Sequence, residues 1–395
     1  MGRIGIFGGT FNPIHNGHVL AVEEFQRLLA LDQVIVIPAA VPPHKRLPQG
    51  APDAGARLAM VQAATAHLPY VTVSDIELRR EGKSYTADTL RQLHAQRPED
   101  TFFLLLGTDS FLSLDSWYEP EVIVQLATLV WAHRDAESKQ QQQQLLQQEA
   151  HLQQLGARVI KLENTFADIS SSTVRRMLAF GCGESYVPPA VMQSITAQGF
   201  YGVGESWKQL PFDALKEKSL SLHKAKRVPH VIGCCQTAQA LAEQYGANPT
   251  DAARAGILHD ITKALDGAEQ LQLCKKYDIM LTDLERNNAK LLHAKTGAAV
   301  AHFVFGENDA VCDAIYWHTT GKADMTLLEK IIYLADYMEP TRDFDGVEQL
   351  RDLAKTDLDA ALLRGFEMSL ELLQQRGKAI DPNSRAARDY LLRKE

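Results

Sequence analysis

Two glycines and two histidines lie close together near the start of this sequence. Gly8 and Gly9 follow a short apolar run, and His15 and His18 precede a segment with helix-like spacing of apolar residues. Adjacent glycines leave no side chain between the backbone and a phosphate, so main-chain N–H groups can approach it. The N-terminal end of the next helix also favours anions. The stretch 8–18 therefore predicts a nucleotide-phosphate site that both histidines face, rather than an ordinary turn with packed histidines.

A second group of candidate residues lies in the C-terminal half. His259 and Asp260 are adjacent within an apolar segment expected to be helical, and burying such a pair is costly unless something compensates it. A divalent metal ion does so, because imidazole and carboxylate are both good ligands. Other isolated histidines and an isolated aspartate could complete the set: His230, His293, His318 and Asp336.

Further polar fragments of the first half follow expected strands or open expected helices. Lys45 offers a cation for phosphate, although a loop lysine is often only solvated. The hydroxyl-rich stretch 84–89 suits either a bound carboxylate or an ordinary helix cap. Asp109 ends an apolar strand shortly before Trp117. Hydroxyls in the stretch 169–175, with Arg175 one turn into the helix, predict an anion site.

The elements that position these residues alternate between strands and helices in the first half. Continuous apolar strands separated by helices predict a doubly wound parallel α/β sheet, covered on both faces. Ligands of such sheets bind at the carboxyl ends of the strands, where the polar fragments fall. The expected strands are residues 4–7, 34–37, 71–74, 101–106, 129–132 and 158–162. The main expected helices after the first are residues 55–66 and 86–96.

The pattern becomes wholly helical in the second half. A length of 395 residues suits two domains. We predict an α/β domain at residues 1–202, a linker at 203–216 and an all-α domain at 217–395. The glutamine tract 140–148 is expected to form an elongated surface helix, although such tracts can also indicate disorder or self-association.

Composition narrows the classes of partner. A net charge of −8 argues against a nucleic-acid-binding protein. No signal peptide opens the chain, and no run of about 18 apolar residues could span a bilayer. The five cysteines form no CxxC pair and are expected to be reduced thiols. We therefore expect a cytoplasmic protein without a membrane partner, whose oligomeric state is left open.

The stretch 8–18 resembles the nucleotide-binding signature of the nucleotidyltransferase superfamily, with Asn12 in place of the usual Asp. Over about residues 1–202 the fragments resemble nicotinate-mononucleotide adenylyltransferases, although Thr108 stands where that family more often has Ala. The resembling fragments are residues 42–45, 84–90, 107–109 with Trp117, 169–175 and 186–188. The resemblance implies a Rossmann-like fold and transfer of AMP from ATP to nicotinate mononucleotide, giving deamido-NAD and pyrophosphate in NAD biosynthesis.

The same resemblance implies roles for particular residues. Catalysis by direct in-line attack would depend on His15, His18, Lys45, Arg175 and Mg²⁺. Thr86 and its neighbours would bind the nicotinate carboxylate, Trp117 would stack on the pyridine ring, and Asp109 would hold a ribose. The implied binding residues for ATP or the second substrate are Gly8, Gly9, Thr10, Phe11, Ser84, Tyr85, Thr86, Asp109, Trp117, Ile169, Ser170 and Ser171.

The order H…HD…D in the second half resembles the HD phosphohydrolase superfamily. The fragments 292–294, 318–321 and 333–342 are similar to those of bacterial HD-domain diadenosine tetraphosphatases, across about residues 217–395. The resemblance implies iron or a similar divalent metal on His230, His259, Asp260 and Asp336, and symmetric cleavage of diadenosine tetraphosphate to two ADP. Candidates for contacts with phosphate or a second metal are Lys263, His293, His318, Thr319, Thr320 and Arg342.

Two alternative interpretations remain open. The first domain could transfer a nucleotide to a related phosphate substrate. The second could be a regulatory nucleotide-binding module without turnover, although its full set of ligands favours catalysis. The leading interpretation is a bifunctional enzyme whose ligands are ATP, nicotinate mononucleotide and dinucleoside polyphosphates.

Overall fold

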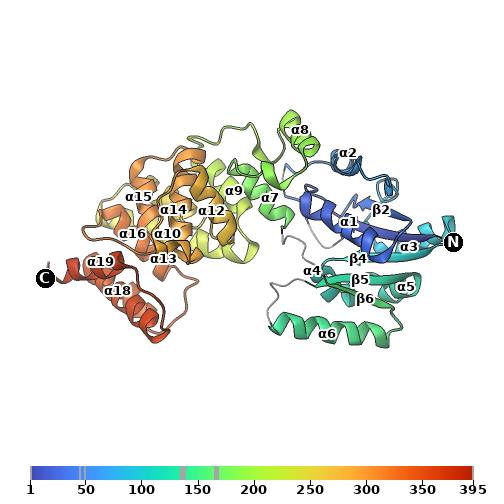
Figure 1. Cartoon of the computed structure of the whole chain (residues 1–395). Coiled ribbons are helices and arrows are strands. Elements are labelled where there is room, and N and C mark those ends of the chain that lie inside the picture. The colour runs from blue at the N-terminus through green and yellow to red at the C-terminus, as the bar shows by residue number, and fades with distance from the viewer. Residues whose placement is uncertain (1, 44–45, 49, 134–138, 164–168, 394–395) are drawn as a thin grey trace. The chain divides into compact units, whose positions relative to one another are not determined.

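The chain forms two compact units, Met1–Gly204 and Glu205–Glu395. The computed structural model describes residues 2–43, 46–48, 50–133, 139–163 and 169–393 (Figure 1). Within these residues, no helix has both the length and the apolar character needed to cross a membrane.

The first unit contains a six-stranded sheet in which every neighbouring pair is parallel. The strand order is β3-β2-β1-β4-β5-β6, which confirms the predicted doubly wound α/β fold. The strands are β1 (Arg3–Gly9), β2 (Gln33–Pro38), β3 (Val71–Val73), β4 (Thr101–Leu106), β5 (Ala127–His133) and β6 (Val159–Glu163).

Helices cover both faces of this sheet, as Figure 1 shows. Alternate residues of β2 enter different cores, because successive side chains of a strand point to opposite faces: Val34 and Val36 enter one, Ile35 and Ile37 the other. The first core includes side chains of α1 (Asn16–Leu29), α2 (Ala54–Thr65), α7 (Ser171–Ala179) and α8 (Pro189–Gln198). The second includes α3 (Thr86–Gln96), α4 (Thr108–Leu112), α5 (Pro120–Leu126) and α6 (Lys139–Gln154).

The glutamine tract lies within α6, as predicted. Leu145 and Leu152 of this helix are fully buried in the second core, whereas Leu146 is 60% exposed. Residues seven apart lie on the same face of a helix, so two leucines are enough to dock it. The tract is therefore a surface helix whose glutamines occupy the outer face.

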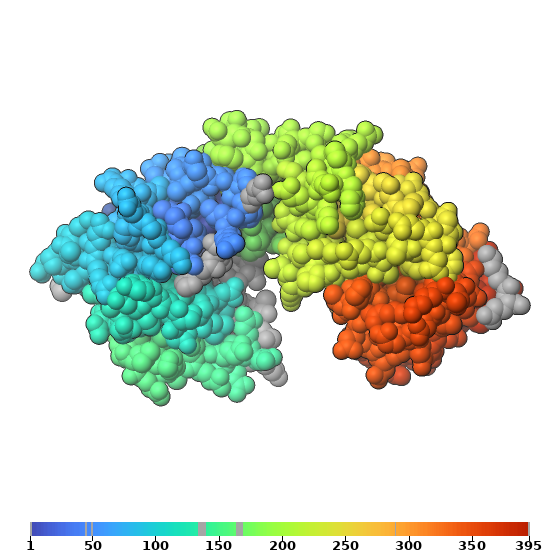
Figure 2. Space-filling view, turned by 180° about the vertical axis from the view of Figure 1, so that it is seen from behind, coloured from blue at the N-terminus to red at the C-terminus, as the bar shows by residue number. Residues whose placement is uncertain are grey.

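Among the described residues of the second unit, the regular elements are all helices, joined by turns and loops. Its helices are α9 (Phe212–Leu222), α10 (Val228–Tyr245), α11 (Pro249–Leu258), α12 (Gly267–Lys276), α13 (Asp283–Arg286), α14 (Ala289–Val300), α15 (Asp309–Trp317), α16 (Leu327–Met338), α17 (Val347–Leu353), α18 (Leu358–Gln375) and α19 (Pro382–Leu392). The last three form the red-orange part of this unit's surface in Figure 2.

Much of the segment 203–216, expected to be a linker, packs within the second unit. Trp207 is buried, and its ring centroid lies 5.7 Å from that of Phe305. The backbone N–H of Gln209 donates to the Phe305 carbonyl at 2.8 Å, and α9 begins at Phe212. The second unit accordingly starts near residue 205.

Close packing of α10 against α11 brings two candidate ligands together. A Cβ on Gly256 would lie 2.7 Å from the Cys235 Cα, so any larger residue would push the helices apart. His230 lies on α10, and His259 directly follows α11. The absent side chain at Gly256 therefore lets their rings meet.

Candidate active sites: a phosphate loop and a metal centre

The loop after β1 lies where the strand order of the sheet reverses. β1 pairs with β2 on one side and with β4 on the other, so the carboxyl ends of β1 and β4 flank a topological switch point. Gly8 and Gly9 are the last two residues of β1. A Cβ on Gly8 would meet nothing within 4 Å, whereas one on Gly9 would lie 2.9 Å from the Phe11 ring. Gly8 thus leaves the backbone open, and Gly9 makes room for Phe11.

The two predicted histidines stack on each other at the start of α1. Their ring centroids are 3.6 Å apart, and the His15 backbone N–H donates to His18 Nδ1 at 3.3 Å. Both ring nitrogens of His15 are buried and have no hydrogen-bond partner among the described residues. Burial lowers the pKa of His15 to about 4. Burial and the neighbouring His15 also hold the pKa of His18 well below its usual value. Both rings are therefore neutral near pH 7.

Several side chains from later in the chain form hydrogen bonds to the signature loop, residues 8–18. Arg175 donates to the Asn12 carbonyl at 2.6 Å, and burial lowers its pKa. Ser171 donates to the Pro13 carbonyl at 2.9 Å. The Tyr201 hydroxyl donates to Asn12 Oδ1 at 2.7 Å, so the residue that departs from the family pattern has a specific partner. The predicted anion site at the start of α7 is thereby joined to the loop.

Ser170 and Ile169 have local roles in this structure. The Ser170 hydroxyl accepts from the Thr173 backbone N–H at 3.1 Å and caps α7. Ile169 packs partly buried against the first core.

The predicted substrate residues gather at the start of α3 and the end of β4. Ser84 accepts from the backbone N–H groups of Ala40 and Val41, at 3.0 and 3.3 Å. Tyr85 precedes α3, whose first residue is Thr86, and the Tyr85 ring lies 4.5 Å from that of Tyr118. This contact brings the start of α3 near the segment that contains Trp117.

Asp109 and Trp117 also belong to this region. Asp109 is exposed in α4, directly after β4. Trp117 is half-buried, and its indole N–H donates to Ser113 Oγ at 3.3 Å. His44 and Lys45 lie outside the described residues.

The four candidate histidines of the second unit each have one ring nitrogen fixed by an acceptor. Each Nδ1 lies 2.6 to 2.9 Å from a carbonyl or carboxylate oxygen. Such oxygens only accept, so Nδ1 carries the proton and Nε2 of the neutral ring presents a lone pair. The pairs are His230 with Glu339, His259 with Gly256, His293 with Lys290 and His318 with Ile315.

The free Nε2 atoms converge on two carboxylates. His230 Nε2 lies 3.3 Å from His259 Nε2 and 3.2 Å from Asp336 Oδ1. Lone pairs and carboxylate oxygens repel one another at these distances unless a cation lies between them. The donor set thus fits a divalent metal.

Asp260 belongs to both possible metal-binding groups. One consists of His230, His259 and Asp260, and the other of Asp260, His293 and His318. Asp260 Oδ2 lies 3.7 Å from His230 Nε2, and Asp260 Oδ1 lies 3.2 Å from His293 Nε2. One carboxylate therefore faces a histidine pair with each of its oxygens.

Three cationic side chains surround these groups. Lys263 Nζ lies 2.8 Å from His293 Nε2 and 3.5 Å from Asp260 Oδ1. Arg342 donates to Asp336 Oδ1 at 2.5 Å, and Arg227 donates through Nε to Asp260 Oδ2 at 2.7 Å.

The two threonines after His318 differ in position. The Thr319 hydroxyl lies 3.2 Å from His318 Nε2 and so reaches the cluster. The Thr320 hydroxyl instead donates to the Gly321 carbonyl at 3.1 Å. The structure therefore brings Thr319 to the metal-binding groups and gives Thr320 a local bond.

The adjacent His259 and Asp260 are not in a helix, contrary to the expectation for this segment. α11 ends at Leu258, and the chain continues in turns closed by bonds from Ile261 N to Leu258 O and from Lys263 N to Asp260 O. In a continuous helix, neighbouring side chains would diverge by about 100°. The turn directs both side chains into the same cluster.

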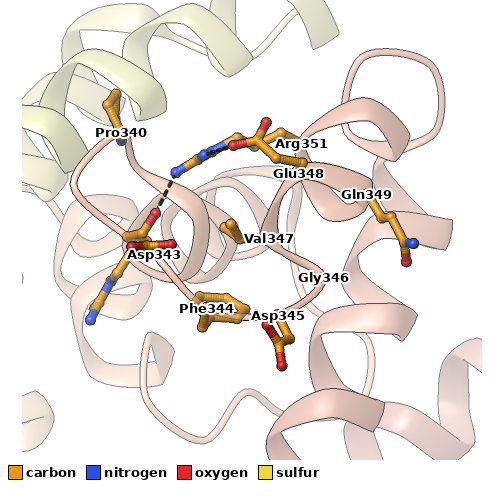
Figure 3. Close-up of a pocket in the computed structure, with 10 residues that line it drawn as sticks. Pro340, Asp343, Phe344, Asp345, Gly346, Val347, Glu348, Gln349 and Arg351 are labelled. Atoms are coloured by element: carbon orange, nitrogen blue, oxygen red, sulfur yellow. Dashed lines mark hydrogen bonds and ion pairs between the residues drawn. The ribbon is translucent and has the colours of Figure 1, made fainter.

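Figure 3 shows a hollow lined by the segment that follows Pro340. Its volume is about 540 Å³, and Arg342, which donates to Asp336 of the cluster, is among its lining residues. Carboxylates of Asp343, Asp345 and Glu348 line it, so it is a poor receptor for phosphate groups. Arg351, at its edge, donates to the carbonyls of Met338, Glu339 and Arg342.

Sequence reasoning missed three residues around the metal centre. Glu339 orients His230, Arg227 pairs with Asp260, and Arg351 holds the segment that contains Glu339 and Arg342. Glu339 is fully buried, and a Cβ on Gly233 would lie 2.4 Å from its Oε2. Glu339 lies within the fragment 333–342 of the sequence analysis, three residues after Asp336, but no role was assigned to it there.

The geometry defines an α/β nucleotide-binding domain followed by an all-α domain with a histidine–aspartate metal centre. A cytidylyltransferase-like family model matches residues 6–177, and an HD-domain model matches residues 227–341. Through its N-terminal half, the chain belongs to the nicotinate-nucleotide adenylyltransferase family.

Two curated relatives and one solved structure illustrate these similarities. The chain is 42% identical to a probable nicotinate-nucleotide adenylyltransferase of Geobacter metallireducens, over 50% of this chain and 98% of that protein. The corresponding protein of Syntrophotalea carbinolica is 40% identical, over 50% and 97%. A predicted HD superfamily hydrolase involved in NAD metabolism, from Clostridium acetobutylicum, is 36% identical with a TM-score of 0.46, over 47% of this chain and 99% of that one.

Proposed function

We propose that the chain is a bifunctional enzyme. Its first unit transfers AMP from ATP to nicotinate mononucleotide, and its second hydrolyses dinucleoside polyphosphates at a metal centre. The main support for the first activity is 42% identity across nearly all of a curated relative, together with an open glycine loop at the switch point of the sheet. The HD-domain match and the convergent Nε2 atoms support the second.

In the first unit, the phosphate oxygen of nicotinate mononucleotide attacks the α-phosphorus of ATP and pyrophosphate leaves. The open backbone at Gly8 lets N–H groups of the loop approach the phosphates. The neutral rings of His15 and His18 donate hydrogen bonds to phosphate oxygens, where negative charge develops. Mg²⁺ bound to the phosphates supplies further charge stabilisation. No covalent enzyme intermediate is needed, because in-line attack requires only positioning.

The nicotinate carboxylate is proposed to bind at the start of α3. Backbone N–H groups of a helix's first turn lack internal partners, and the positive helix end favours an anion. Tyr85, Thr86 and the nearby Trp117 would surround the pyridine ring. A nicotinamide group presents an N–H₂ to these donors and leaves groups unpaired, at about 1–3 kcal/mol each.

Assays of the intact chain with ATP and either mononucleotide test this assignment. We expect kcat/KM to be at least about 10-fold higher for the nicotinate form, corresponding to about 1.4 kcal/mol. Equal kcat/KM values would contradict recognition of a carboxylate at α3.

In the second unit, His230, His259, Asp260 and Asp336 would hold the metal, and His293 and His318 would contact phosphate or a second metal. A bound divalent ion lowers the pKa of water and polarises a phosphoryl oxygen. Lys263, Arg227 and Arg342 would hold the phosphate chain, because their cations border the cluster. Iron or a similar metal and diadenosine tetraphosphate are the proposed metal and substrate.

Product analysis with diadenosine tetraphosphate tests this second activity. The expected products are two ADP. Release of ATP and AMP would contradict symmetric cleavage, and absence of turnover in metal-loaded protein would favour a regulatory role.

A further inference from the structure

We propose that Arg57 is a positioning residue for adenylyl transfer, which holds the signature loop in its phosphate-binding form and adds positive charge beneath it. This inference rests on the proposed function of the first unit. Arg57 lies on α2, outside the signature stretch and outside every other predicted site fragment.

Arg57 ties together two loops that follow neighbouring strands. One of its terminal nitrogens donates to the Thr10 carbonyl at 2.6 Å and the other to the Ala40 carbonyl at 3.2 Å. Thr10 follows β1 and Ala40 follows β2, and these strands pair up to Gly9 and Pro38. The guanidinium thus fixes the spacing of two loops at the carboxyl edge of the sheet.

The contact at Thr10 also controls the direction of a peptide group. A peptide C=O and the following N–H point in opposite directions, so anchoring the Thr10 carbonyl on Arg57 directs the Phe11 N–H away from the protein interior. Phe11 has a φ of 46°, a left-handed conformation that a residue with a large side chain rarely adopts. Its ring packs against Phe7 and His18. Arg57 therefore stabilises a strained turn within the phosphate loop.

Arg57 also contributes a positive charge next to the phosphate loop. The side chain is fully buried, and within the described residues no carboxylate forms an ion pair with it inside 4.0 Å. Burial lowers its pKa, against opposing effects of Tyr201 and Asp53, yet a guanidinium stays protonated in proteins. A buried cation is costly, and carbonyl dipoles and the more distant Asp53 compensate it only in part. A polyphosphate bound at the loop would supply further negative charge.

Three substitutions separate these contributions. Arg57→Met keeps the length of the side chain but removes its charge and donors. Arg57→Lys keeps the charge but replaces the two separate nitrogens with one, which we expect to release one of the two carbonyls. Arg3→Met is the matched control, because Arg3 also donates twice to a carbonyl, that of Leu29, but at the amino end of β1. Each full-length variant is assayed for kcat, both KM values, melting temperature and calorimetric affinity for magnesium pyrophosphate.

We expect Arg57→Met to lower kcat by about 100-fold and to weaken pyrophosphate binding by at least about 10-fold. Arg57→Lys should keep most of the pyrophosphate affinity but lose about 10-fold in kcat, since one carbonyl is released. Arg3→Met should change only the melting temperature.

Arg57 would be merely structural if either variant kept wild-type kcat and pyrophosphate affinity while melting earlier. If Arg57→Met does not fold, Arg57→Lys decides alone: unchanged kcat overturns the proposal, and reduced kcat with retained pyrophosphate affinity supports it. If wild-type protein makes no deamido-NAD, the proposed function fails, and the role of Arg57 is then judged from pyrophosphate affinity.

Discussion

The two units present sites of opposite construction. In the first, one contiguous stretch supplies the glycines, the strained Phe11 and both neutral histidines, while the distant side chains of Arg57 and Arg175 hold its carbonyls. In the second, isolated side chains from separate helices and turns supply every candidate ligand. One site depends on backbone shape and the other on convergence of buried charge.

This contrast has a physical origin. A phosphate chain is long and can be bound by successive N–H groups of one loop, so its receptor can be local in sequence. A metal ion needs several ligands from different directions at about 2 Å, which one helix face cannot provide. The first site should therefore tolerate loss of a single contact better than the second.

The largest expected effect is loss of a metal ligand. Asp336→Ala should abolish metal binding. Hydrolysis of diadenosine tetraphosphate should fall by on the order of 10³-fold, because without the metal no activated water is available. Adenylyl transfer should stay unchanged. Metal content by elemental analysis and rates of both reactions test this, with the exposed Asp343→Ala as the matched control.

The ligand assignment would be wrong if Asp336→Ala kept its metal and full turnover. Equal loss of both activities in a folded variant would instead contradict two independent sites.

The next largest effect concerns the first site. His18→Ala should lower kcat for adenylyl transfer by about 10²–10³-fold, the usual result of removing one donor to developing charge. Hydrolysis by the second unit should not change. His94→Ala is the control, since His94 is exposed on α3. An unchanged kcat in His18→Ala would show that loop backbone alone carries the chemistry.

The fold could be predicted from the sequence because its apolar residues follow clear strand and helix patterns. Continuous apolar strands predict a parallel sheet, and all six expected strands lie close to the observed ones. The signature loop was also predictable, since its residues are contiguous. The histidines and aspartates of the second unit were found as isolated polar residues in apolar segments, and five of them converge in two groups.

Supporting residues were harder to find for a physical reason. Arg57, Glu339 and Arg351 act on backbone carbonyls or on the far nitrogen of a ring, so no spacing pattern marks them. For Arg57 one signal existed: it shares a helix face with Met60, Val61 and Ala64, all buried, and a cation on such a stripe needs a partner. The turn at His259 was not predicted because the apolar residues around it are typical of a helix.

A smaller effect on metal affinity is expected from Glu339, which would act on the metal only through His230. Glu339→Gln should weaken metal affinity by about 10–100-fold, because the lost negative charge makes the His230 ring less basic. Competition with a chelator measures this, and Glu348→Gln in the nearby helix α17 is the exposed control. Unchanged affinity would limit Glu339 to packing against Gly233.

The smallest effect is expected in stability and belongs to the first site. The pKa of His15 is about 4 in the folded protein and ordinarily 6.5, so between these values the unfolded chain binds more protons. Unfolding is therefore favoured as pH falls through this window. From pH 7 to about pH 5.5, His15 should reduce the free energy of unfolding by about 1 kcal/mol.

His15→Gln should remove that loss, whereas His67→Gln, an exposed control, should not. Denaturant titrations in a Trp207→Phe, Trp317→Phe background leave only the tryptophans of the first unit, Trp117 and Trp131, as reporters. An equal loss in His15→Gln and wild-type protein would mean that the pKa of His15 is the same in the folded and unfolded chain, so that burial in the first site would leave this imidazole unperturbed.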